Sequence, residues 1–175
     1  DMVNWTDEGE IPVAGPNGAA KWASNSWAPT VACKKINGVD KFFLYFANNA
    51  SSIGVLTASS PTGPWTDPLG RPLITRSTAG CSDVTWLFDP AVLVDDDGTG
   101  YLYFGGGIPG SSQSDYANPK TARVIKLGSD MTSVSGSAAT IDAPFMFEDS
   151  GIHKFNGKYY YSYCTNFGGN HSNGA

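Results

Sequence analysis

Three segments of similar pattern follow one another along this chain, and their repetition constrains the fold more than any other feature of the sequence. Each consists of a strand-like run, a polar turn and an aromatic return run, which reads FFLYF, YLYF or YYYSY. The turns contain Asn-Gly or Asp-Gly at Gly38, Gly98 and Gly157, which lie 60 and 59 residues apart. Such dipeptides between strand-like runs are typical of β-hairpins. The sequence therefore predicts three successive hairpins.

A further pair of strand-like runs follows each of the first two hairpins. These runs are residues 52–59 and 71–75 after the first hairpin, and residues 120–127 and 137–141 after the second. Four strands in a unit of about 60 residues are typical of a β-propeller blade. We therefore predict an all-β fold with little helix, in which the 175 residues form roughly three blades. The alternative is an ordinary β-sandwich with coincidentally similar hairpins.

Propellers close with at least four blades, so we expect the native chain to continue beyond both ends of this sequence. Residues 1–12 read as the outer half of an earlier blade, and the chain ends just after the third hairpin.

Charge and composition indicate which partners the protein can have. The net charge is −5 and the eleven Lys and Arg residues are scattered, which argues against nucleic acid as a partner. Nine Phe, eight Tyr and five Trp suit a neutral polysaccharide or oligosaccharide, which is recognised by aromatic platforms and hydrogen bonds. No apolar run approaches the roughly 18 residues of a membrane span, so no membrane partner is expected.

Sequons and cysteines bear on the compartment. The three Asn-x-Ser/Thr sequons, at Asn4, Asn49 and Asn170, favour a secreted, extracellular protein, which we expect to be a monomer. The three cysteines match no metal motif, and one disulfide plus one free thiol can form among Cys33, Cys81 and Cys164.

Two acidic residues occupy the same position in successive repeats. Asp89 lies nine residues before Gly98, and Glu148 lies nine residues before Gly157. The first strand of each propeller blade lines the central channel, so both side chains are expected to reach one pocket. Two converging carboxyl groups are what glycoside hydrolysis requires, one to protonate the leaving oxygen and one to activate water or attack the sugar. The first repeat has no acid there, only Ala28-Pro29-Thr30.

Each of these assignments has a plainer alternative. Asp89 can be a turn residue before Pro90 that bonds its own backbone, and Glu148 can be an exposed residue at a strand start. A one-residue error in register would exchange Glu148 with Asp149.

Other candidate residues lie near these strands. Stacking on sugar rings, or alternatively packing in the core or between blades, is expected of Trp27, Trp86 and Phe88. The acidic run Asp95 to Asp97 resembles part of a calcium loop but lacks its downstream Glu, so we expect a plain hairpin turn. The two histidines, His153 and His171, have no companion at metal-ligand or triad spacing. No metal site is predicted.

At these residues the sequence resembles glycoside hydrolase family 43. Four patterns carry the resemblance: SWAP at 26–29, SSPTGPWTDP at 59–68, FDPAVLVDDDGTGYLYFGG at 88–106, and FEDSGIHKFNGKYYYSYCTN at 147–166. The resemblance implies a five-bladed β-propeller. It makes residues 1–175 an incomplete catalytic domain that runs from the end of blade 1 through blade 4. It also implies cleavage, with inversion, of arabinofuranosyl or xylosyl linkages in arabinoxylan, arabinan or xylan.

The family uses three carboxyl groups, and the resemblance assigns two of them here. Glu148 matches the general acid, and Asp89 matches the aspartate that sets the pKa of the acid and orients it. The general base would precede Asp1, which itself matches a later strand, so this segment alone is expected to be inactive. Thr30 stands where family members often carry an acid. No cofactor is required, although a structural calcium ion is possible in the intact protein.

Two other functions remain open. One is a non-catalytic propeller that binds glycans without cleaving them. The other is a retaining propeller hydrolase of the fructan type, which expects an Arg before the Asp-Pro pair, where this chain has Phe88.

Overall fold

The computed structural model describes residues 3–165, and within this range the fold is built from antiparallel sheets. Three sequence-based assignments, at Asp1, at the sequon of Asn170 and at His171, lie outside the described residues. The expected low helix content is confirmed there, because the described residues contain one helix, the single turn α1 (Gln113–Ala117). None of the described helical segments is long and apolar enough to cross a membrane.

The first sheet contains three strands in the order β1 (Trp27–Ile36), β2 (Val39–Asn48) and β3 (Ser52–Ala58). The turn between β1 and β2 is at Asn37 and Gly38, both with positive φ, as the Asn-Gly signal predicts. β3 is buried along its whole length, and its partner β2 is buried from Phe43 to Ala47.

The fourth strand predicted at residues 71–75 is not a regular strand. Two isolated antiparallel bridges to β3 take its place, Thr57 with Thr66 and Ile53 with Ile74. Pro72 lies within this segment and Pro64 and Pro68 precede it, and proline has no N–H to donate to a sheet ladder. The chain therefore follows β3 only at the two bridges.

The second sheet has the four strands expected of a complete blade. Their order is β4 (Ala91–Val94), β5 (Gly100–Phe104), β6 (Arg123–Leu127) and β7 (Val134–Thr140), each antiparallel to its neighbour. The third sheet is the hairpin of β8 (Met146–Phe155) and β9 (Lys158–Thr165). All three predicted hairpins are thus confirmed.

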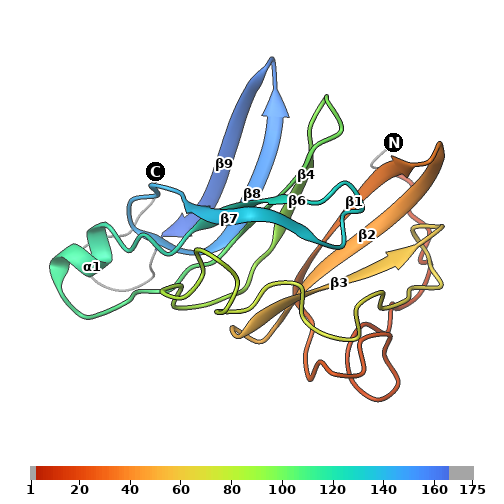
Figure 1. Cartoon of the computed structure of the whole chain (residues 1–175), viewed down its shortest axis with the longest axis horizontal. Coiled ribbons are helices and arrows are strands. Elements are labelled where there is room, and N and C mark those ends of the chain that lie inside the picture. Colours follow the sequence, from red (N-terminus) through yellow and green to blue (C-terminus); the bar gives the residue numbers. More distant parts are fainter. Residues whose placement is uncertain (1–2, 166–175) are drawn as a thin grey trace.

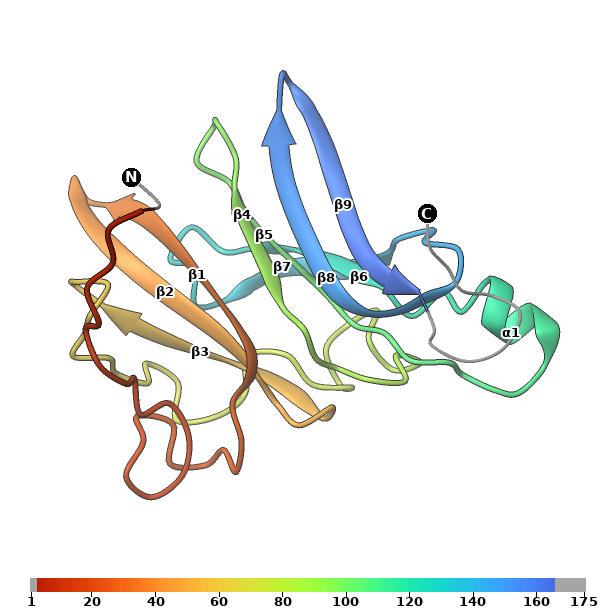
Figure 2. The same cartoon turned by 180° about the vertical axis from the view of Figure 1, so that it is seen from behind.

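The first strands of the three sheets lie next to one another. β1 contacts β4, and β4 contacts β8, so that the three sheets follow each other side by side (Figures 1 and 2). A buried cluster that includes Phe43, Tyr45, Leu102 and Phe104 fills the space between the first and second sheets. The Tyr45 hydroxyl crosses this core and donates to the Met131 carbonyl at 2.7 Å. This arrangement gives the starts of β1, β4 and β8 a common location.

Residues Asp95 to Asp97 form the hairpin turn that we predicted. The Gly98 N–H donates to the Asp95 carbonyl at 2.8 Å, which closes the turn. The carboxylates of Asp95 and Asp96 bind the Lys154 ammonium at 2.6 and 2.7 Å. These contacts hold the pKa of Asp95 at about 2 and join the tip of the β4–β5 hairpin to β8. The turn acids therefore bridge two sheets.

Two further expectations can be compared with the structure. Residues 3–12 form no strand, although we expected the outer half of a blade there, and their side chains are exposed rather than packed on a neighbouring sheet. All three cysteines are free thiols, so no disulfide joins them.

Candidate active site

A cleft of about 350 Å³ opens where β1, β4 and β8 begin. The wall is formed by three short stretches: residues 28–30 at the start of β1, 89–92 at the start of β4, and 149–152 in the first half of β8. The cleft therefore forms at equivalent positions of the three sheets, as the repeat predicted. Thr30 is part of this wall, and β1 contributes no acidic residue to it.

The backbone has the same unusual conformation at one residue of each of these three stretches. φ is 41° at Ala28, 48° at Asp89 and 63° at Asp149. A left-handed backbone is uncommon for residues other than glycine, and such strain concentrates at functional sites. Register shifts accompany it in β1, between Trp27 and Thr30, and in β8 on either side of Glu148. The bends direct these residues into the cleft rather than along the sheet.

Asp89 is a buried carboxyl group at the base of this cleft, and only 7% of its surface is exposed. Its Oδ2 accepts a hydrogen bond from the Asp149 backbone N–H at 2.8 Å. The partner lies in another sheet, so Asp89 is not a turn residue that bonds its own backbone. Burial raises the pKa of Asp89, and the Asp149 N–H partly opposes that shift because it stabilises the carboxylate.

Glu148 is half-buried directly before Asp149. Its pKa is raised, first by burial and then by the negative charges of Asp149 and Asp89. A raised pKa keeps a carboxylic acid protonated at higher pH, which a general acid requires. The charge of Asp89 thus acts on Glu148, and its hydrogen bond fixes the peptide group that follows Glu148.

In the third repeat, the residue that corresponds to Asp89 is Asp149, one residue later than the spacing from the hairpin glycines predicts. Counting back from the hairpin glycines placed Glu148 at the position of Asp89, but Asp149 shares the left-handed φ and the cleft wall with Asp89. The count failed because the β4–β5 turn, residues 95–99, is longer than the β8–β9 turn, residues 156–157, and because β8 is bulged. Asp149 therefore lines the cleft with Asp89, and Glu148 directly precedes it without lining the cleft.

The predicted aromatic platforms lie beside the cleft rather than in its wall. Phe88 is buried, and Trp86 packs edge-on against both Phe88 and Phe147, with ring centroids 5.3 and 5.1 Å apart. Trp27 is 44% exposed at the start of β1. The ring contacts support a packing role for Phe88. The exposure of Trp27 leaves its side chain accessible to a ligand. His153 is exposed on β8 and stacks on Tyr160.

One group among residues 3–165 has the ligand spacing of a metal site. Its members are Glu148, Asp149 and Cys164, whose ligand atoms all lie within 4.8 Å of one another. Calcium takes six to eight oxygen ligands, so a set with two carboxylates and a thiol does not fit it. Burial and the two acids raise the pKa of Cys164, and a protonated thiol is a poor ligand for softer metals. We assign this group no metal.

Sequence reasoning missed the polar residues behind the acids. Ser150 lines the cleft, and its hydroxyl lies 2.9 Å from the Tyr161 hydroxyl on β9. Both residues lie in the pattern at 147–166, but their spacing of 11 residues signals no contact, so their proximity is apparent only in the folded sheet. The alternation of residues along β8 and β9 is too short to mark Ser150 or Tyr161 as part of a site.

The geometry defines a class of site. Glu148, whose pKa is raised, directly precedes Asp149 in the cleft wall, and the buried Asp89 fixes the peptide group between these two residues. Glycosidic bonds are hydrolysed by pairs of carboxyl groups whose different surroundings give them different pKa values and different roles.

Comparison with known proteins assigns the family. The model of glycosyl hydrolases family 43 matches residues 1–175, and the chain belongs to this family. The chain is 74% identical to an arabinoxylan arabinofuranohydrolase of Bacillus subtilis (strain 168) and 75% identical to one of Paenibacillus polymyxa, over 98% of its length. It spans only 35% and 28% of these two relatives.

Solved structures agree with this assignment. The Bacillus subtilis family 43 arabinoxylan arabinofuranohydrolase, solved in complex with cellotetraose, superposes with a TM-score of 0.95 at 72% identity, covering 98% of this chain and 37% of that one. An α-L-arabinofuranosidase of Clostridium thermocellum ATCC 27405 gives 0.78 at 46% identity, covering 95% of this chain and 51% of that one.

Proposed function

We propose that the protein removes arabinofuranosyl groups from arabinoxylan, a plant cell-wall polysaccharide. The observation that carries this proposal is the convergence of Asp89 and Asp149 in the wall of one cleft, with Glu148 directly before Asp149 and subject to both charges. Relatives at 74% and 75% identity, named as arabinoxylan arabinofuranohydrolases, favour arabinofuranosyl over xylosyl linkages. The oligosaccharide bound to the solved Bacillus subtilis relative supports a glycan ligand.

The proposed reaction begins with Glu148 in its protonated form. Glu148 donates its proton to the glycosidic oxygen as the bond to the arabinosyl group breaks. Burial and the charge of Asp149 raise the pKa of Glu148, and the charge of Asp89 adds to this shift. Asp89 also fixes the backbone after Glu148 through the Asp149 N–H. A base carboxylate, which the family resemblance places before Asp1, activates water on the opposite face of the sugar. Inversion requires about 6.5–9.5 Å between base and acid, which leaves room for that water.

We also propose that the three sheets are successive blades of a five-bladed propeller, because β1, β4 and β8 run side by side as inner strands do. Arabinoxylan is a polymer that stays outside the cell, which supports a secreted protein. We propose that it acts as a monomer.

The test is to incubate the full-length protein with arabinoxylan and to follow the anomeric configuration of fresh product by NMR. We expect released arabinose of inverted configuration. Retained configuration would support the fructan-type mechanism instead. Glycan binding without any release of sugar would show a non-catalytic propeller.

A further inference from the structure

A close backbone contact joins the second sheet to the strand that carries Glu148. The Gly107 N–H donates to the Phe147 carbonyl at 2.8 Å, and Phe147 directly precedes Glu148. A Cβ atom on the neighbouring Gly106 would lie 2.3 Å from that same carbonyl oxygen, so a side chain there would prevent the approach. The close approach of this backbone to Phe147 thus explains why glycine occupies position 106 in the run Gly105 to Gly107.

A buried threonine holds Gly107 from behind. Thr121 is 1% exposed, and its hydroxyl donates to the Gly107 carbonyl at 2.9 Å. The two bonds of Gly107 therefore form a continuous path from Thr121 to the peptide group before Glu148.

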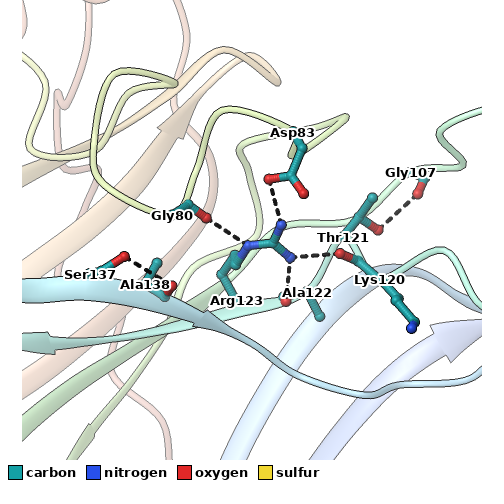
Figure 3. Close-up of polar contacts among 9 residues, drawn as sticks. All are labelled: Gly80, Asp83, Gly107, Lys120, Thr121, Ala122, Arg123, Ser137 and Ala138. Carbon is teal, nitrogen blue, oxygen red and sulfur yellow. Dashed lines mark hydrogen bonds and ion pairs between the residues drawn. The ribbon is translucent and has the colours of Figure 1, made fainter.

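Thr121 is in turn fixed on both sides by a buried guanidinium. Arg123, 2% exposed, donates from Nη1 to the carbonyls of Lys120 at 2.6 Å and Ala122 at 3.0 Å. Figure 3 shows this fork around Thr121, with the threonine hydroxyl directed at Gly107. Because Arg123 is tied to the residues on either side, Thr121 has little freedom to move away from Gly107.

We propose that Thr121 is a positioning residue for Glu148, acting through Gly107 and the Phe147 carbonyl. This inference rests on the proposed function of Glu148 as general acid. Glu148 is then held on both sides: Gly107 fixes the peptide group before it, and Asp89 fixes the peptide group after it. A general acid gains its effect only when its proton is aimed at the leaving oxygen, and small displacements are costly.

The test compares two substitutions at one position in the full-length protein. Thr121→Val keeps the shape and removes the donor, whereas Thr121→Ser keeps the donor. Thr57→Val is the matched control, because Thr57 is a buried threonine of β3 whose hydroxyl pairs with Thr66, away from this path. We expect Thr121→Val to lower kcat on arabinoxylan by about tenfold or more, with KM nearly unchanged and activated aryl arabinosides less affected.

A second readout does not depend on turnover. The Glu148 carboxyl can be titrated by ¹³C NMR and assigned by its loss in Glu148→Gln. The charged and titratable groups that face it are Asp149 on β8, Cys164 on β9 and Asp89 before β4. A loosened Glu148 becomes better solvated, so its pKa should fall in Thr121→Val and stay unchanged in Thr121→Ser and Thr57→Val.

The outcomes separate this inference from the proposed function. An unchanged Glu148 pKa in Thr121→Val, or an equal loss in Thr121→Ser, overturns the positioning role. A wild-type protein that releases no sugar overturns the proposed function, while the titration still decides the role of Thr121.

Discussion

Glu148→Gln should lower kcat/KM on arabinoxylan by about 10²- to 10⁴-fold, the usual contribution of a general acid. Glutamine has nearly the same shape but cannot deliver a proton to the leaving oxygen. Activated aryl arabinosides, whose leaving groups need little protonation, should lose much less. Steady-state kinetics on both substrates with the full-length protein measures this difference.

Glu10→Gln is a suitable control for this experiment, because Glu10 is exposed in the N-terminal segment. It should leave both rates unchanged. If Glu148→Gln reduced both substrates equally, Glu148 would act in binding or folding, and the acid role would be wrong.

Arg123→Met should lower the free energy of unfolding by about 3 kcal/mol, because buried acceptors lose their partners. Arg123 donates to three backbone carbonyls, those of Gly80, Lys120 and Ala122, and to the Asp83 carboxylate at 2.7 Å. Asp83 is 73% exposed, so after the substitution it regains water and contributes little to the loss. The carbonyl contacts therefore account for most of the effect.

Asp83→Asn isolates the ion pair from the carbonyl contacts. We expect it to cost less than about 1 kcal/mol, because exposed ion pairs contribute little. Urea unfolding of both variants measures the two values. A loss in Asp83→Asn as large as that in Arg123→Met would show that the ion pair, and not the carbonyl fork, stabilises this part of the fold.

The hairpins of the fold could be predicted because their signals are local. Asn-Gly and Asp-Gly with aromatic return runs mark each turn without any knowledge of the neighbouring sheets. The predicted strand at residues 71–75 failed for a local reason as well. It pairs with β3 only at Ile74, because Pro72 lies within it, and the apolar residues Leu73 and Ile74 obscured that constraint.

The sequence predicted that Asp89 and the acidic residues of the third repeat lie close together, but not the register of that repeat. Asp89 and Asp149 line one cleft, because bulges in β8 and unequal turn lengths shift the register by one residue from Glu148. Such shifts are not encoded in residue spacing. The link from Thr121 to Glu148 had no sequence signal at all. It depends on Gly107 meeting Phe147 across two sheets, and this contact exists only in the packed structure.

The central claim is that the charge of Asp89 contributes to the raised pKa of Glu148, beside burial and the charge of Asp149, and the pH dependence of kcat/KM in Asp89→Asn tests it most directly. The alkaline limb of that profile reports the loss of the acid's proton in the free enzyme. Removing a negative charge that raises the pKa of Glu148 must lower that pKa, so the limb should move to lower pH. Asp142→Asn, an exposed acid between β7 and β8, should leave it in place. An alkaline limb that stays unchanged or moves to higher pH in Asp89→Asn would contradict the account.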